Sequence, residues 1–197
     1  MSYNPRDRFF LKAKKENFAA RSVYKLQEID TKYRIFRSGQ VCLDLGCSPG
    51  SWSQYASQKV GERGRVLGVD LQPVTVSLPN AVFIEADLRD LKLEDVFREH
   101  GFEPPFDVVI SDMAPKTTGI KFTDQARSME LCELALQTAS RFLKPGGAFV
   151  CKFFESGDFA ALRKQFQNVF RKVEFVKPES TRSMSKEIFF VGLDKKG

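Results

Sequence analysis

Apolar residues in this chain follow two patterns, short continuous runs and stripes that repeat every three or four positions. The short runs, which suit buried strands, occupy 40–45, 65–70, 81–86, 106–111 and 147–153. The stripes, which predict amphipathic helices, occupy 19–33, 51–60, 93–100, 123–143 and 158–170. Because strand and helix alternate along most of the chain, the pattern predicts a parallel sheet with helices on both faces.

The C-terminal part departs from this rhythm. Two further strands are predicted at 172–177 and 187–193, and no helix separates them. Strands joined without a helical crossover are expected to be antiparallel neighbours. The predicted fold class is therefore α/β, with a mostly parallel, seven-stranded, doubly wound sheet that ends in an antiparallel hairpin. A chain of 197 residues suits a single domain over 1–197.

A glycine-containing turn follows the first predicted strand, in the sequence DLGCSPGSW at 44–52. Gly46 and Gly50 lack a Cβ, so the backbone at these positions can approach a bound ligand closely. A dinucleotide site needs the pattern G-x-G-x-x-G to hold a pyrophosphate, and that spacing is absent here. The turn therefore indicates a nucleotide-like cofactor that lacks a diphosphate.

Three carboxylates lie at or just beyond the carboxyl ends of predicted strands near this turn. Asp70 is placed to accept hydrogen bonds from a ribose diol, Asp87 from an adenine amino group, and Asp44 is placed beside the cofactor's amino-acid moiety. A strand-end aspartate often only caps the next helix or turn. Three of them beside a glycine turn favour a binding site over three separate caps.

Two other strand ends carry residues suited to chemistry. Asp112 follows the strand at 106–111, and Lys152 ends an apolar strand and precedes two phenylalanines. A charged lysine in so apolar a setting is unfavourable, so either a carboxylate holds it or it acts in its neutral form. The alternative is a half-buried lysine whose ammonium group reaches water. Glu187, at the start of the last strand, would by itself pass for a surface residue.

The net charge of +6 arises entirely from the first 37 residues. This basic segment also contains Phe9, Phe10, Phe18 and Tyr24, a combination suited to phosphate contacts and base stacking. The alternative is a solvated basic helix whose aromatic residues pack into the core. We predict that 1–37 is a basic, partly helical, RNA-binding segment.

Other classes of site find less support in the composition. The four cysteines, Cys42, Cys47, Cys132 and Cys151, have no metal-binding spacing, and His100 is the single histidine. We therefore expect buried cysteines, no metal site and no Ser-His-Asp hydrolase. The N-terminus lacks the apolar stretch of a signal peptide, and no apolar run is long enough to span a membrane, so a cytoplasmic location is expected.

Taken together, these motifs resemble the FtsJ/RrmJ family of RNA ribose 2′-O-methyltransferases over about 20–191. The matching stretches are RSVYKLQEI (21–29), DLGCSPGSWSQY (44–55), SDMAP (111–115), LKPGGAFVCKFF (143–154) and RSMSKEIFFV (182–191). The resemblance implies the Rossmann-like fold of S-adenosylmethionine-dependent methyltransferases. Within the family, the similarity is greatest to bacterial enzymes that methylate a uridine ribose in large-subunit ribosomal RNA. We also expect the protein to be a monomer.

The resemblance also implies roles for individual residues. The family's catalytic tetrad falls on Lys25, Asp112, Lys152 and Glu187. Cofactor contacts are expected at Asp44, Gly46, Gly50, Trp52, Asp70, Asp87 and Asp112, and the cofactor would be S-adenosyl-L-methionine. RNA contacts are expected at Arg6, Arg8, Lys12, Lys14, Lys15, Arg21, Lys116 and Arg182, with ribosomal RNA, within the large subunit, as the partner.

Two positions depart from the family pattern. Ser51 stands where many relatives have a second glycine, which puts the backbone path in question, and Lys116 stands where an asparagine is usual. Alternatives also stay open. Transfer RNA is a second possible substrate, and a non-catalytic ribosome-assembly protein would share the basic segment. An NAD-dependent oxidoreductase would share the fold but would need the missing pyrophosphate pattern.

Overall fold

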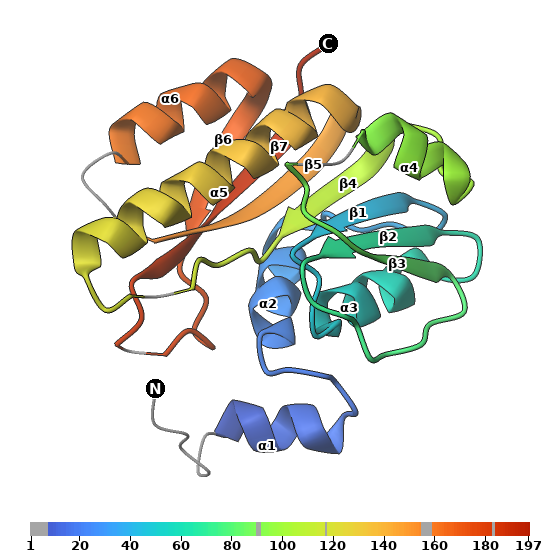
Figure 1. Cartoon of the computed structure of the whole chain (residues 1–197), viewed down its shortest axis with the longest axis horizontal. Helices are drawn as coiled ribbons and strands as arrows, with labels where there is room; N and C mark the ends of the chain where they lie inside the picture. The colour runs from blue at the N-terminus through green and yellow to red at the C-terminus, as the bar shows by residue number, and fades with distance from the viewer. Residues whose placement is uncertain (1–7, 90–91, 117, 155–158, 183) are drawn as a thin grey trace.

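A seven-stranded sheet organises the residues that the computed structural model describes, namely 8–89, 92–116, 118–154, 159–182 and 184–197 (Figure 1). The strands are β1 (Val41–Leu45), β2 (Arg65–Asp70), β3 (Ala81–Glu85), β4 (Phe106–Ser111), β5 (Leu143–Phe154), β6 (Phe170–Val176) and β7 (Glu187–Lys195). Their spatial order is β3-β2-β1-β4-β5-β7-β6. β1 to β5 run parallel, whereas β7 is antiparallel to both β5 and β6. The predicted α/β fold with a closing antiparallel hairpin is confirmed.

Helices cover both faces of this sheet (Figure 1). They are α1 (Arg8–Lys15), α2 (Val23–Tyr33), α3 (Ser51–Val60), α4 (Leu93–Glu99), α5 (Lys121–Phe142) and α6 (Phe159–Val169). One apolar cluster contains buried side chains of α4, α5 and α6, and a second contains those of α1, α2 and α3. The sheet therefore separates two cores, as expected for a doubly wound fold.

Alternation along each strand divides its residues between the two cores. In β1, Cys42 packs in the cluster with α2 and α3, while Leu43 packs in the cluster with α4, α5 and α6. In β7, Phe189 packs in the cluster with α2 and α3, and Phe190 packs in the cluster with α4, α5 and α6. Because successive side chains of a strand point to opposite faces, both faces of a central strand must be apolar. This explains why the sequence shows continuous apolar runs at these positions.

Several predicted boundaries shift by a few residues. The helix predicted over 19–33 begins at Val23, because the amide of Ala19 donates a hydrogen bond to the Gln54 side chain on α3 instead of joining a helix. β5 begins at Leu143, where the predicted helix 123–143 was expected to end. Helix α1 was not predicted as a separate element, since its eight residues are highly charged. No helix of the described residues has both the length and the apolar character needed to cross a membrane.

Candidate active site

Lys152 and Asp112 form an ion pair at the carboxyl ends of two neighbouring parallel strands. The Lys152 Nζ lies 2.8 Å from the Asp112 Oδ1 and donates a second hydrogen bond, of 2.5 Å, to the Asp112 carbonyl oxygen. The register of β4 with β5 pairs Ser111 with Cys151, so the next residue of each strand lies at the same level. Of the alternatives raised by the sequence, the structure shows the lysine held by a carboxylate.

Lys25 and Glu187 form a second ion pair. The Lys25 Nζ, on α2, lies 2.5 Å from the Glu187 Oε1 at the start of β7, and both side chains are largely shielded from solvent. These residues are separated by most of the chain, so no local sequence pattern joins them. The fold brings them together by placing α2 against the face of the sheet that β7 completes.

The register of β5 with β7 places the two ion pairs side by side. Lys152 pairs with Phe189, and Glu187 pairs with Phe154, so Lys152 and Glu187 are diagonal neighbours on one face of the sheet. Such neighbours in an antiparallel pair are about 7–8 Å apart. The Lys25 Nζ also lies 5.9 Å from the centre of the Phe189 ring. The four predicted tetrad residues therefore converge on the α2 side of β5 and β7.

Burial gives this cluster its electrostatic character. Lys152 and Glu187 each expose 8% of their surface. A buried charge without a partner is strongly destabilising, whereas two buried pairs of opposite charge compensate each other. The four side chains form two pairs of opposite formal charge, and within each pair the two partners hold each other's charged atoms in place.

Glu28 and Arg21 anchor the loop that leads to Glu187. Glu28 was not identified as a site residue from the sequence, and Arg21 was expected to contact RNA. The Glu28 carboxylate accepts hydrogen bonds from the backbone amides of Glu179 (2.6 Å) and Ser180 (3.0 Å). The Arg21 guanidinium donates to the Ser180 carbonyl oxygen. Glu28 lies three residues after Lys25, hence on the same side of α2. That spacing, together with its place in the stretch RSVYKLQEI, could have indicated a role for Glu28.

The glycine turn after β1 adopts the conformation that its residues allow. Gly46 and Gly50 have φ values of 75° and 111°, in the region that side chains rarely adopt. A Cβ at Gly46 would lie 2.5 Å from the Met113 Cγ, and one at Gly50 would lie 2.4 Å from the Val76 Cγ2. Both glycines are therefore required by the backbone path and by close packing.

Asp44 is fully buried below this turn. Burial raises the pKa of its carboxyl group to about 7, with smaller contributions from the negative charges of Asp112 and Asp70, and the Ser53 hydroxyl opposes the shift. That hydroxyl donates a 2.6 Å hydrogen bond to the Asp44 Oδ2. The other oxygen, Oδ1, is buried and has no hydrogen-bond partner. An unsatisfied buried carboxylate oxygen is the kind of group that a ligand's donor would satisfy.

Asp70 and Asp87 lie at the ends of the next strands but differ in their partners. Asp70 accepts hydrogen bonds from the backbone amides of Ser48 (2.9 Å) and Gln72 (2.8 Å), so it joins the glycine turn to the loop after β2. Asp87 pairs with Arg89, whose hydrogen bonds lower the pKa of the Asp87 carboxyl group to about 2. Both keep the positions predicted for cofactor contacts, and their roles stay predictions.

Trp52 is buried in the core that α3 shares with α2 and β7. Its indole Nε1 donates a 2.9 Å hydrogen bond to the Ser22 carbonyl oxygen, and its ring lies 5.8 Å from that of Phe189, centre to centre. Ser51, a departure from the family pattern, begins α3 and shares a 2.9 Å hydrogen bond with the Ser22 hydroxyl. Trp52 and Ser51 thus join the glycine turn to the helix that carries Lys25.

The predicted RNA contacts fall into two groups. Arg8, Lys12, Lys14 and Lys15 lie on α1, near Arg21, while Arg6 lies outside the described residues. Lys116 and Arg182 are exposed in loops that follow Asp112 and precede Glu187. The aromatic residues of the basic segment pack against protein, since Phe9 and Phe18 contact Tyr24 with ring centres 5.5 and 6.5 Å apart. This part of the alternative interpretation is confirmed.

The four cysteines are buried and unbridged, as predicted. The Sγ atoms of Cys132 and Cys151 lie 3.3 Å apart in the core between α5 and β5. Within the described parts of the chain, no group of three or more His, Cys, Asp or Glu side chains is arranged to hold a metal ion.

Comparison with known proteins decides the family. The family model described as FtsJ-like methyltransferase matches residues 18–195, nearly the whole chain. The chain belongs to the FtsJ-like methyltransferase family. The expected family is thereby confirmed, and the fold around the two ion pairs is that of a methyltransferase.

Curated relatives of this FtsJ-like chain match it over nearly its full length. One from Bdellovibrio bacteriovorus, named ribosomal RNA large subunit methyltransferase E, is 72% identical over 196 residues, which cover 100% of both chains. Another of the same name, from Oleidesulfovibrio alaskensis, is 53% identical and covers 98% of this chain and 93% of its own.

Solved structures support the same family fold. A crystal structure assigned as a ribosomal RNA methyltransferase from Plasmodium falciparum matches with a TM-score of 0.78 and 26% identity, covering 91% of this chain and 100% of that one. Fibrillarin from Aeropyrum pernix, solved with S-adenosyl-L-methionine bound, matches with a TM-score of 0.62 and 17% identity over 87% of this chain and 76% of its own. At that identity, fibrillarin supports the fold alone.

Proposed function

We propose that this chain is an S-adenosylmethionine-dependent methyltransferase that modifies a ribose 2′-hydroxyl in large-subunit ribosomal RNA, with a uridine as the target. The observation that carries the proposal is the convergence of Lys25, Asp112, Lys152 and Glu187 as two ion pairs on one face of β5 and β7. The names of the curated relatives support ribosomal RNA as the substrate class. A ribose hydroxyl needs a base and precise alignment before it can act as a nucleophile, and the cluster offers both.

The residues near the glycine turn fit S-adenosylmethionine. Gly46 and Gly50 keep the backbone free of side chains, and the buried Asp44 Oδ1 lacks a donor. Asp70 and Asp87 present carboxylates at the ends of β2 and β3, where a ribose and an adenine amino group would find acceptors. When bound, the cofactor supplies a methyl group that its sulfonium already activates for displacement. The amino acids then need only hold the acceptor hydroxyl and remove its proton.

Lys152 is the proposed base. Its Nζ has two acceptors in this structure, the Asp112 carbonyl oxygen and the Asp112 carboxylate. To act as a base, Lys152 must first release the proton that it carries in the ion pair. The neutral amine then has two N–H donors and one lone pair, so both donors would be satisfied and the lone pair would be left for the 2′-hydroxyl proton. Asp112 thus fixes the direction of the Lys152 lone pair as well as the position of its nitrogen.

Lys25 and Glu187 are proposed to hold the acceptor ribose in register. Glu187, diagonal to Lys152 on the sheet, is placed to accept a hydrogen bond from the ribose, and its ion pair with Lys25 keeps the carboxylate in place. The positive charge of Lys25 would stabilise the hydroxyl oxygen as it loses its proton. These roles assign one function to each member of the cluster.

The experiment that tests the proposal is methyl transfer from radiolabelled S-adenosylmethionine to separated RNA fractions from cells that lack this enzyme. Large-subunit ribosomal RNA should be labelled, and mapping should place the label on a uridine 2′-oxygen. Assembled large subunits should be offered beside free RNA, because the substrate must expose an unstacked nucleotide.

Other outcomes would change the proposal in defined ways. Labelling of transfer RNA alone would overturn ribosomal RNA as the substrate, and a base-methylated product would overturn the role of Lys152. Tight binding of RNA with no transfer to any fraction would indicate a non-catalytic assembly protein.

A further inference from the structure

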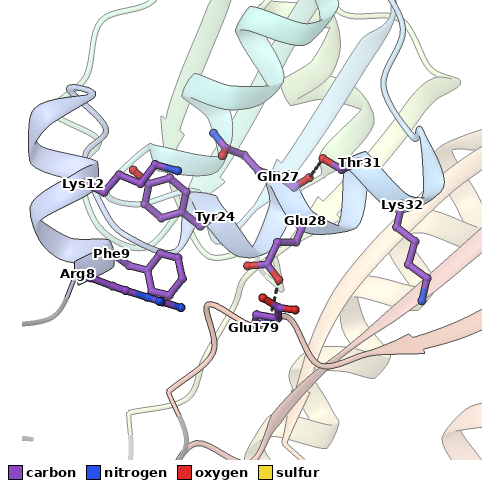
Figure 2. Close-up of a pocket in the computed structure, with 9 residues that line it drawn as sticks. All are labelled: Arg8, Phe9, Lys12, Tyr24, Gln27, Glu28, Thr31, Lys32 and Glu179. Carbon is purple, nitrogen blue, oxygen red and sulfur yellow. Dashed lines mark hydrogen bonds between the residues drawn. The ribbon is translucent and has the colours of Figure 1, made fainter.

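An open pocket of about 700 Å³ lies between α1, α2 and the loop after β6 (Figure 2). None of the four tetrad residues lines it. Its walls include Arg8, Phe9, Lys12, Tyr24, Lys32 and Glu179, which come from three separate segments of the chain. A volume of this size suits a small molecule or one residue of a polymer.

The pocket adjoins the tetrad through α2. Lys25, Glu28 and Lys32 are spaced by three and four residues, so they lie along one side of this helix. Lys32 is seven residues beyond Lys25, which corresponds to about 10 Å along the helix axis. Glu28 lies between them on the helix, and its carboxylate accepts hydrogen bonds from the amides of Glu179 and Ser180. Glu28 therefore separates the tetrad from the pocket. A strand of RNA whose ribose reached the tetrad would have its neighbouring nucleotide near this pocket.

The chemistry of the walls is that of a nucleotide site. The Arg8 guanidinium carbon lies 4.8 Å from the centre of the Phe9 ring, and the Lys12 Nζ lies 4.5 Å from that of Tyr24. Single-stranded RNA is commonly bound by stacking bases on aromatic rings or guanidinium planes, with lysines and arginines on the phosphates. Glu179 adds a carboxylate, which can accept hydrogen bonds from base N–H groups.

We propose that this pocket binds a nucleotide adjacent to the methylated one, with Lys32 on a phosphate and the base stacked on the Arg8 guanidinium, which itself lies over the Phe9 ring. The proposal rests on the proposed function for the identity of the RNA. Beyond that function, the pocket would be a separate nucleotide subsite, with α1 as one wall and Lys32 of α2 as a phosphate contact.

Two substitutions separate the charged contact from the stacking contact. Lys32→Met should weaken binding of a large-subunit ribosomal RNA transcript and lower the slope of log affinity against log salt by about 1. Phe9→Leu removes the ring that supports the Arg8 guanidinium, so it should weaken binding about tenfold and leave the salt slope unchanged. Lys164→Met is the matched control, because Lys164 is another exposed helical lysine and lies on α6. It should leave both quantities as in the wild type.

Crosslinking provides a direct measurement on the unmodified protein. The transcript is substituted with 4-thiouridine, bound in the presence of S-adenosylhomocysteine and irradiated, and the crosslinked peptides are identified. Peptides containing residues 8–12 or 24–32 should be joined to nucleotides within two positions of the methylated one. Binding of S-adenosylhomocysteine should be equal in all variants, which shows that the cofactor side is intact.

The failures of the two proposals can be told apart. If the wild type methylates ribosomal RNA while both variants bind it like Lys164→Met and crosslinks fall elsewhere, the pocket proposal is overturned and the proposed function stands. If the wild type methylates no RNA but Lys32→Met still lowers the salt slope, the proposed function fails and the pocket remains an RNA site.

Discussion

The candidate site has two regions, the tetrad at β5 and β7 and the carboxylates at β1 and β2, and they differ in the partners of their charged side chains. At the β5 and β7 end, Lys152 pairs with Asp112 and Lys25 pairs with Glu187, so every charge of the tetrad has a protein partner. At the β1 and β2 end, the donors that the described residues offer to Asp44 and Asp70 are neutral, a hydroxyl and backbone amides, and among these residues the Asp44 Oδ1 has no donor. The first end is complete without a ligand, whereas the second is not.

This difference indicates what each end is built to do. A cluster of matched buried charges holds its own geometry, which is what the alignment of a nucleophile requires. A group of carboxylates without cationic partners raises the energy of the empty site and favours a ligand that brings positive charge. S-adenosylmethionine carries both an ammonium and a sulfonium, so the proposed cofactor matches Asp44 and Asp70, whose described donors are neutral.

The largest expected effect comes from removing the base while keeping the ion pair. Lys152→Arg preserves the positive charge beside Asp112 but cannot accept a proton at neutral pH. The rate of methyl transfer should fall by about 10²–10⁴, the usual contribution of a general base. Single-turnover assays would measure the rate, and calorimetry should find the affinity for S-adenosylhomocysteine unchanged. Full turnover by this variant would remove Lys152 from the role of base.

The next effect concerns the incomplete end and its dependence on pH. The folded-state pKa of Asp44, about 7, lies above the unfolded value near 4, so the folded protein holds a proton that the unfolded chain releases between these pH values. Stability should therefore fall as pH rises from 4 to 7, by at most about 4 kcal/mol from this group.

The substitution Asp44→Asn isolates this contribution, because it keeps an acceptor for Ser53 and cannot ionise. Urea unfolding of both proteins without ligand at pH 4.5 and 7.5 would measure the difference. The variant should lose less stability over this interval than the wild type. Equal losses would show that Asp44 does not titrate within it.

A smaller effect is expected at Glu28, which anchors the loop before the tetrad residue Glu187. Glu28→Ala removes the acceptor of two charge-assisted hydrogen bonds and frees the loop before Glu187. We expect about 2 kcal/mol lower stability and a roughly tenfold lower kcat, with unchanged affinity for S-adenosylhomocysteine. Glu28→Gln, which keeps one acceptor, should restore part of kcat.

The matched control for this loop is Glu130→Ala, because Glu130 is an exposed glutamate on α5. It should leave kcat and stability unchanged. If Glu28→Ala lowered stability but left kcat as in the wild type, Glu28 would be a structural residue without a positioning role.

The smallest effect is expected at the exposed rim of the cofactor end. Asp87 has a lowered pKa because Arg89 donates to it, so this pair contributes stability that is present above pH 4 and lost as pH falls toward 2. Because the pair is partly exposed, Arg89→Gln should change stability by less than about 1 kcal/mol. Acid titration followed by circular dichroism would measure it. A large loss at neutral pH would mean that Arg89 has a structural role beyond this pair.

Much of this arrangement was predictable because it depends on local pattern. The apolar runs and stripes identified the seven strands and most helices, and the glycine turn followed β1 as expected. Helix α1 was missed, since its charged residues show only a short apolar stripe, and its stability depends on packing against α2. The individual cofactor and RNA contacts stay predictions.

The sequence alone determined where the strands lie and which polar residues stand near their carboxyl ends, because burial on two faces demands continuous apolar runs. These polar residues are not always the last of a strand, since β5 continues past Lys152 to Phe154 and β1 continues past Asp44 to Leu45. Tertiary structure alone decided which of those residues meet. Lys25 joins Glu187 only because β7 inserts between β5 and β6 and α2 packs on that face. The role of Glu28 likewise depends on a loop more than 150 residues away in the chain. Such contacts reflect strand order and register, which distant parts of the chain settle together and no local pattern encodes.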